Sequence, residues 1–132
     1  DSEAELITGI SDPIAAGQKI LELGPSFVIV KKGEYGSVLV DKNNTAVLPA
    51  FPLAIEDVID PTGAGDSFAG GFMGYIATVN EINFEEMKTA MAWGTVTASF
   101  TLQSFGLEGL VSTTKEQLQE RMEAFKKVAS LD

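Results

Sequence analysis

The stretch from Asp60 to Met73 constrains the fold of this chain more than any other. It reads Asp-Pro-Thr-Gly-Ala-Gly-Asp-Ser-Phe-Ala-Gly-Gly-Phe-Met and predicts a loop that passes into a helix at Ala64. The first N–H groups of a helix have no intrahelical acceptor and carry partial positive charge, so a helix that begins among glycines can bind an anion. The sequence therefore predicts an open helix N-terminus with Asp66 on its first turn.

An anion site beside a carboxylate suits the transfer of a phosphoryl group to an alcohol. The N–H groups of Gly63, Ala64 and Gly65 would stabilise the phosphoryl charge, and the Asp66 carboxylate would accept the hydroxyl proton. The same residues could instead form a plain tight turn, with Asp66 favouring the helix dipole. A P-loop is excluded because no Lys follows the glycines, and a dinucleotide-binding fingerprint needs glycine where Phe68 stands.

Composition removes several classes of chemistry. The chain has no histidine and no cysteine, which excludes Ser-His-Asp and Cys-His catalysis, zinc fingers and thiol redox chemistry. Any general base must therefore be a carboxylate, a lysine or a tyrosine. A net charge of −10 argues against a nucleic-acid partner. No apolar run reaches the ~18 residues of a membrane span and no signal-peptide pattern is present, so we expect a cytoplasmic protein without a membrane partner.

Apolar patterns in the first half predict a helix, a strand and a hairpin. A helical turn over Glu3–Thr8 comes first, followed by a helix over 12–23 that an Asp-Pro pair starts. Phe27–Val30 is a continuous apolar run, which favours a strand buried on both faces. Ser37–Val40 and Thr45–Leu48 flank a polar turn and are interpreted as a β-hairpin.

Apolar stripes at helical spacing predict three helices in the second half, over 64–79, 84–102 and 114–130. Asn83 is expected to cap the second of them. Thr113-Thr114 with Glu116-Gln117 provides a capping box for the third. The Met and Phe residues of these stripes are assigned to the core.

The whole stretch from Asp60 to Met73 resembles the second signature of the ribokinase-like (PfkB) carbohydrate and nucleoside kinases. It shares the Asp-Pro start, the Gly-Ala-Gly-Asp core and a Gly-Gly pair followed by two apolar residues. The resemblance implies an α/β fold: the C-terminal part of a three-layer α/β/α sandwich, with a parallel strand and a β-hairpin followed by three helices. It also implies that Asp66 is the catalytic base and that Gly63, Ala64 and Gly65 form the anion hole.

A second segment, Lys31-Lys32-Gly33-Glu34-Tyr35-Gly36, follows the apolar strand. By itself it could be an ordinary glycine-containing hairpin turn. It also resembles the Lys/Thr-Gly-x-x-Gly turn that borders the nucleotide in the family. The residues this implies for binding ATP are Lys32, Gly33, Glu34 and Gly36, together with Thr62 of the first motif, with the two glycines clearing space for the nucleotide.

Metal sites are implied by the resemblance alone. Glu3 matches the glutamate of the family's Asn-x-x-Glu element, which organises Mg²⁺ and phosphate through water, although the asparagine would precede Asp1. Asp60 and Gly106 correspond to the monovalent-cation site of some members, although the segment before Gly106 departs from the usual basic version. The implied cofactors are ATP, Mg²⁺ and, from this looser match, K⁺.

The resemblance covers residues 1–132 as the C-terminal ATP-binding and catalytic portion of the family fold, without the N-terminal half and the lid. It implies an ATP-dependent kinase that phosphorylates a hydroxymethyl group of a sugar or nucleoside. Ribose, fructose, a deoxy-keto-gluconate and adenosine all remain open as acceptors, and the full-length protein could be a homodimer. Two alternatives stay open: a nucleotide-binding fragment that is inactive without its N-terminal half, and a structural α/β domain without catalysis.

Overall fold

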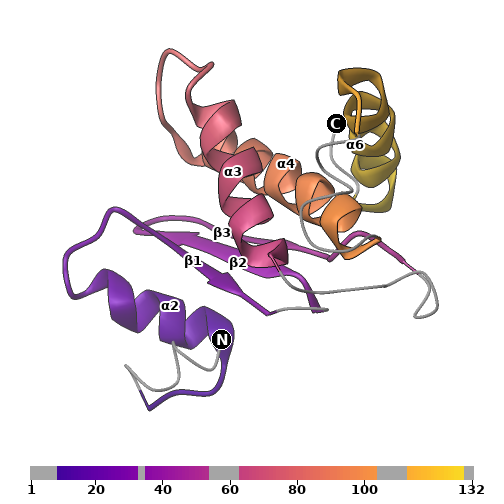
Figure 1. The fold of residues 1–132 in the computed structure, drawn as a ribbon. Coiled ribbons are helices and arrows are strands. Elements are labelled where there is room, and N and C mark those ends of the chain that lie inside the picture. Colours follow the sequence, from indigo (N-terminus) through magenta and orange to yellow (C-terminus); the bar gives the residue numbers. More distant parts are fainter. Residues whose placement is uncertain (1–8, 33–34, 54–62, 104–112, 130–132) are drawn as a thin grey trace. The chain divides into compact units, whose positions relative to one another are not determined.

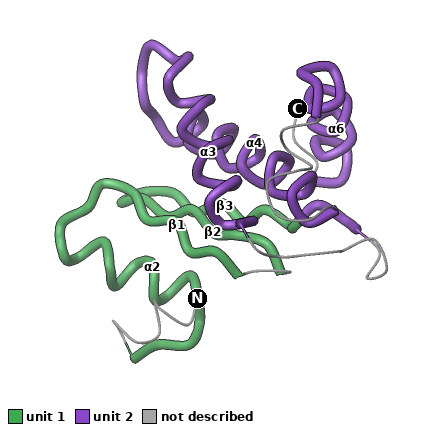
Figure 2. Tube along the Cα trace, in the orientation of Figure 1, with its two compact units in different colours: residues 1–50 green, residues 51–132 purple. Residues whose placement is uncertain are grey.

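The computed structural model describes residues 9–32, 35–53, 63–103 and 113–129 (Figure 1). The chain divides into two compact units, Asp1–Ala50 and Phe51–Asp132 (Figure 2), which are taken in turn. The first unit contains helix α2 (Pro13–Leu21) and strands β1 (Phe27–Lys31), β2 (Ser37–Asp41) and β3 (Thr45–Leu48); the second contains helices α3 (Ala64–Ile76), α4 (Phe84–Leu102) and α6 (Lys115–Ala129). The helical turn predicted over Glu3–Thr8 lies outside the described residues.

Helix α2 begins where the sequence predicts. The Asp12 carboxylate accepts a hydrogen bond from the Ala15 N–H at 2.9 Å, and Pro13 occupies the first turn, where no N–H is needed. The helix ends at Leu21, short of the predicted end at residue 23. The N–H groups of residues 22–24 bond to carbonyls three residues back, which tightens the chain into turns.

The sheet has three strands in the order β1-β2-β3, and both pairings are antiparallel. Within the described residues β1 pairs antiparallel with β2 over Phe27–Lys31, and the parallel strand that the resemblance implies has no parallel neighbour among them. Parallel neighbours need a long crossover connection, whereas β1 and β2 are joined by the short turn at residues 32–36. The described residues therefore contain no parallel pair.

The predicted hairpin of β2 and β3 is confirmed. Its turn is held by Asp41, whose side-chain oxygen accepts from the N–H groups of Asn43 at 2.8 Å and Asn44 at 2.6 Å. Such side-chain bonds to the next residues are the reason that Asp is favoured in turns.

Burial in β1 alternates, which corrects the expectation that this strand is buried on both faces. Val28 and Val30 are buried and pack with Ala16 of α2, while Phe27 and Ile29 are only half-buried. The most fully buried strand is β2, in which Ser37, Val38, Leu39 and Val40 are all buried, because it lies between the other two. Figure 1 shows α2 lying along the sheet.

The helices of the second unit start as predicted. Asn83 caps α4 by accepting from the Glu86 N–H at 2.9 Å. Thr114 and Gln117 form a reciprocal capping box at α6, with N–H to side-chain oxygen distances of 2.8 and 3.1 Å. Helix α3 ends at Ile76, before the predicted end at residue 79.

Helix α4 is buried more widely than its predicted stripe of apolar residues. Its buried positions include Ser99 and Thr101 as well as Met91, whereas Phe84 and Met87 at the start of the stripe are half-buried. A polar residue can be buried when its hydroxyl is hydrogen-bonded. The hydroxyl of Ser99, for example, donates to the carbonyl of Val96 in the same helix.

Helices α3 and α4 approach closely at two glycines. A Cβ on Gly71 would lie 2.5 Å from Thr97 Oγ1 and 2.8 Å from the Trp93 carbonyl oxygen. A Cβ on Gly94 would lie 2.8 Å from the Phe68 carbonyl oxygen. Both distances are too short for a real side chain, so only glycine permits this separation of the helix axes.

A hydrogen bond also joins the C-terminal end of α3 to the N-terminal end of α4. The Tyr75 hydroxyl donates to the Glu86 carboxylate, and this hydrogen bond, followed by burial, raises the pKa of Tyr75. The contact links the last turn of α3 to the first turn of α4.

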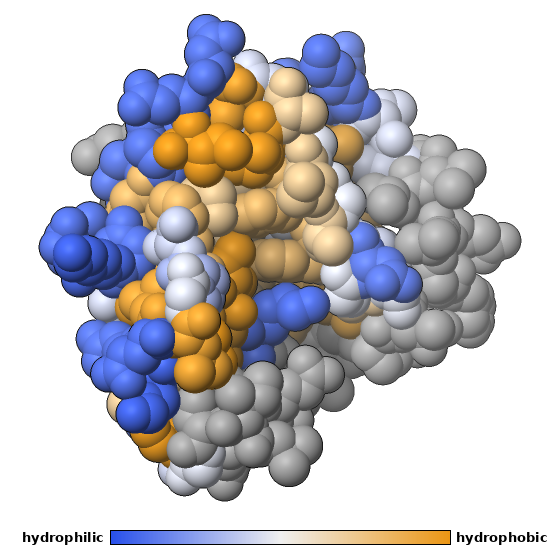
Figure 3. Space-filling model, turned by 90° about the vertical axis from the view of Figure 1, so that its left-hand side faces the viewer, coloured by the Kyte–Doolittle hydropathy of each residue, from blue (hydrophilic) through white to orange (hydrophobic). Residues whose placement is uncertain are grey.

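Some large apolar side chains stay exposed. Leu23 of the first unit and Met73 and Ile82 of the second are 71%, 60% and 56% exposed. Figure 3 shows apolar surface interspersed with hydrophilic side chains on one face. Scattered exposed apolar residues are common on folded proteins, so we assign no function to them.

The glycine contact predicts opposite outcomes for two neighbouring substitutions. Gly71→Ala should destabilise the chain by about 1–3 kcal/mol, because the added methyl group collides with Thr97 and Trp93. Gly70→Ala is the matched control: no atom lies within 4 Å of its added Cβ, and alanine favours a helix over glycine by up to about 1 kcal/mol. Urea unfolding of both variants measures the difference, and equal changes would contradict the close contact.

Candidate functional site

The N-terminal turn of α3 is built by Gly63, which adopts a φ of 84° at the cap position. This left-handed conformation is accessible to glycine at little cost. The first intrahelical bond runs from the Ser67 N–H to the Gly63 carbonyl at 2.9 Å. The N–H groups of residues 64–66 therefore precede the helical hydrogen-bond ladder, as anion-binding helix starts require.

Asp66 lies in this first turn and is exposed, as is Gly65. The cap residue, Gly63, has no side chain that could cover the N-terminal end of α3. The structure thus brings the predicted site residues Gly63, Ala64, Gly65 and Asp66 into one turn, with backbone donors and a carboxylate together. This combination can bind an anion and accept a proton beside it.

Two residues behind this turn, Ser67 and Thr101, carry no sequence pattern that predicts their contact. The hydroxyls of Ser67 and Thr101 are hydrogen-bonded at 2.6 Å, and the two residues are 3% and 0% exposed. The pair joins the first turn of α3 to the last turn of α4. Sequence alone offers only the facts that Ser67 follows Asp66 and precedes Gly71 by one helical turn.

The second predicted segment forms a turn in the first unit. The Lys32 N–H donates to the Gly36 carbonyl at 2.7 Å, and the Tyr35 N–H donates to the Lys32 carbonyl at 3.1 Å. Gly33 and Glu34 lie outside the described residues. Lys32 and Gly36 belong to the first unit and the turn at 63–66 to the second.

The space cleared by Gly36 is filled by the protein itself. Gly36 has a φ of +99°, and a Cβ on it would lie 2.1 Å from the Leu48 carbonyl oxygen and 2.9 Å from Pro49 Cα. The family resemblance implies instead that this glycine clears space for a nucleotide. The contact with Leu48 and Pro49 is a sufficient reason for glycine here, because β2 begins beside the end of β3.

The remaining predicted site residues, Glu3, Asp60, Thr62 and Gly106, lie outside the described residues, so the magnesium and monovalent-cation sites stay predictions. The parts of the chain that are described contain no group of three or more His, Cys, Asp or Glu side chains that could hold a metal ion. Within those same parts, no helix combines the length and the apolar character that crossing a membrane requires.

Arg121 of α6 forms a second polar contact that the sequence did not predict. Its guanidinium lies over the ring of Phe100, 3.7 Å from the centroid, and 5.0 Å from that of Phe51. It also donates to Ser99 Oγ at 3.0 Å. Burial lowers the pKa of Arg121, yet an arginine keeps its charge at neutral pH, so the contact fixes α6 against α4 as a cation–π interaction.

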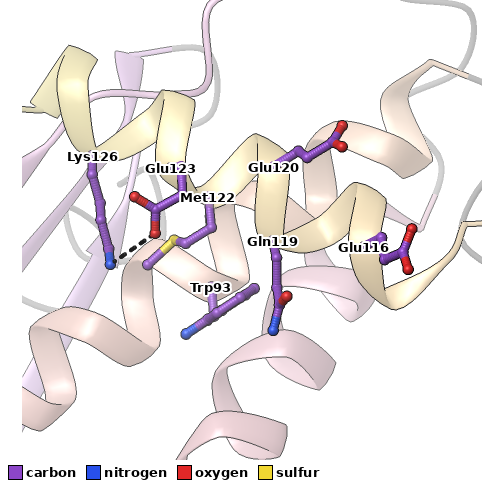
Figure 4. Close-up of a pocket in the computed structure, with 7 residues that line it drawn as sticks. All are labelled: Trp93, Glu116, Gln119, Glu120, Met122, Glu123 and Lys126. Atoms are coloured by element: carbon purple, nitrogen blue, oxygen red, sulfur yellow. Dashed lines mark hydrogen bonds and ion pairs between the residues drawn. The ribbon is translucent and has the colours of Figure 1, made fainter.

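A groove of about 590 Å³ lies between α4 and α6, and Figure 4 shows the side chains that line it. Trp93 of α4 lies opposite Met122 and Gln119 of α6, while Glu116 and Glu120 line the rim of the groove. None of the residues that line the groove was predicted as a site residue. We therefore assign the groove no part in the candidate site.

Comparison with known proteins identifies the family. Residues 1–114 match the model of the pfkB family of carbohydrate kinases, and the chain belongs to that family. A cytidine kinase from Thermococcus kodakarensis is 42% identical over 73 residues, which cover 55% of this chain and 26% of that protein. A ribokinase from Mus musculus is 37% identical over 92 residues, which cover 66% of this chain and 28% of that protein.

Solved structures agree on the fold. The aminoimidazole riboside kinase of Salmonella enterica, solved with aminoimidazole riboside and an ATP analogue, superimposes with a TM-score of 0.78 at 24% identity, covering 92% of this chain and 39% of that one. The α/β arrangement is thus a portion of the ribokinase-like fold, as the sequence predicts. The chain spans less than a third of the length of the cytidine kinase and the ribokinase.

The turn at residues 32–36 leads to a testable difference between two glycines. Gly36→Ala should cost about 1–3 kcal/mol more than Gly24→Ala, because its methyl group would also collide with the Leu48 carbonyl. Gly24 is the matched control, since its φ of +125° is also unfavourable for alanine but no atom lies within 4 Å of its added Cβ. Urea midpoints give the comparison. Equal losses would show that backbone strain alone requires glycine at residue 36.

Proposed function

We propose that this chain carries the phosphoryl-transfer site of an ATP-dependent kinase whose acceptor is a hydroxymethyl group of a sugar or nucleoside. The observation that supports it most is the first turn of α3, where the exposed Asp66 carboxylate stands beside the N–H groups of residues 64–66. The named relatives, a cytidine kinase and a ribokinase, support an acceptor that contains a sugar.

Asp66 acts as the general base in this proposal. Its carboxylate takes the hydroxyl proton of the acceptor while that oxygen attacks the γ-phosphorus of ATP, and the bond from the γ-phosphorus to the β–γ bridging oxygen breaks to release ADP. The N–H groups of Gly63, Ala64, Gly65 and Asp66 would stabilise the charge that grows on the transferring group, which would lower the barrier.

The cofactors follow the family pattern. ATP is the phosphoryl donor and Mg²⁺ neutralises its phosphates when bound; Glu3 is proposed to organise the ion through water. Lys32, Gly33, Glu34, Gly36 and Thr62 are proposed to border the nucleotide. Asp60 and Gly106 are proposed for a monovalent cation such as K⁺.

Other features of the full-length protein stay proposals. The partner is a small-molecule sugar or nucleoside, and a homodimer is compatible with the family resemblance. A cytoplasmic location is supported by the lack of cysteine.

Asp66→Asn tests the assignment in the full-length protein. Because the amide cannot accept the proton, kcat should fall by about 10²–10⁴-fold while the KM for ATP changes little. Asp12→Asn is the matched control, since Asp12 also starts a helix but an asparagine caps it equally well. Steady-state kinetics with ribose and with cytidine as acceptors give the readout. Near-normal turnover of Asp66→Asn would reject Asp66 as the base.

A second candidate is a nucleotide-binding fragment that is inactive without an N-terminal half. The length of the relatives favours this candidate, because the chain corresponds to only 26–39% of each protein compared above. Calorimetric titration of the 132-residue chain with MgATP separates the two readings. Saturable binding without turnover supports the fragment, whereas turnover by the chain alone supports a complete kinase.

A further inference from the structure

Ser67 fixes the candidate site turn in two ways. Its backbone N–H bonds to the Gly63 carbonyl at 2.9 Å and so closes the first ring of α3, the ring that contains Asp66. Its side chain points the other way, into the protein, where its hydroxyl meets Thr101 Oγ1 at 2.6 Å. One residue therefore connects the backbone of the anion-binding turn to the neighbouring helix.

The hydroxyl of Thr101 differs from the others along α4. The hydroxyls of Thr89, Thr95 and Thr97 each donate to the carbonyl four residues back in the same helix, at 3.0, 2.9 and 2.7 Å. This is the usual behaviour of Thr within a helix. The Thr101 hydroxyl instead bonds across to α3, and it does so where both residues are buried.

The turn has little else in its own sequence to hold it. Its cap residue is Gly63, which has no side chain to bond to the helix, and Gly65 adds further backbone freedom. Most helix starts are fixed by a Ser, Thr, Asp or Asn cap. Here the turn is held instead by Ser67, the residue after Asp66, through its hydrogen bond to Thr101 of the adjacent helix.

We propose that Ser67 and Thr101 are a positioning pair, whose hydrogen bond sets the direction of the Asp66 carboxylate and of the N–H groups beside it. The inference rests on the proposed function, in which Asp66 is the base. Both residues are buried, so neither is proposed as a catalytic residue. The pair acts through the first turn of α3, where a displacement of about 1 Å can cost about 10²-fold in rate.

The test is a double-mutant cycle in the full-length protein. Ser67→Ala and Thr101→Val each remove one hydroxyl and leave the other buried and unpaired, which destabilises the fold, whereas the double variant leaves no unpaired hydroxyl and regains stability. We expect kcat to fall about 10- to 100-fold in each single variant and to stay low in the double variant. The KM for ATP should change less than about threefold.

Two further variants control for helix packing. Thr101→Ser keeps the hydroxyl and should retain kcat within about threefold. Thr95→Val makes the same substitution as Thr101→Val on the same helix, but the Thr95 hydroxyl donates to the Met91 carbonyl of its own helix, so kcat should be unchanged. If the single variants fail to fold, the double variant and Thr101→Ser still decide the question.

Each outcome separates the positioning pair from the proposed function. If kcat of the double variant recovers together with its melting temperature, Ser67 and Thr101 only stabilise the fold and the inference is wrong. If every variant of the pair turns over normally while Asp66→Asn is inactive, the inference is wrong but the base is correct. If Asp66→Asn is itself active, the proposed function fails first.

Discussion

The close crossing of α3 and α4 is the contact on which the second unit depends. Gly71 and Gly94 remove two side chains that would otherwise hold the helices apart. Only at this separation can the Ser67 and Thr101 hydroxyls meet at 2.6 Å. The glycines of the motif thus divide into two kinds, because Gly63 shapes the helix start while Gly71 permits the packing that supports it.

Features set by neighbouring residues could be predicted from the sequence. Asp12, Asn83 and Thr114 all start helices as expected, because a cap bonds to N–H groups two or three residues away. The hairpin was equally accessible, since Asp41 makes the turn with its own neighbours. The turn that carries Asp66 was predicted for the same reason, from glycines that are adjacent in sequence.

Features set by distant residues could not be predicted. The carbonyl that meets Gly36 belongs to Leu48, and the partner of Ser67 is Thr101, so neither contact leaves a local pattern. The burial of β1 depends on which strands lie beside it. Asp60, with the other cation and magnesium residues outside the described ranges, remains a prediction from the family resemblance alone.

The hydroxyls of α4 have a consequence for how this protein can change in evolution. A threonine that bonds only within its own helix can become valine or alanine without affecting another element, so Thr95, whose hydroxyl donates to the Met91 carbonyl, should vary freely among related sequences. Ser67 and Thr101 share one hydrogen bond, and removing one hydroxyl leaves the other buried and unpaired, which lowers stability. In natural homologues these two positions should therefore covary, with both hydroxyls kept or both replaced.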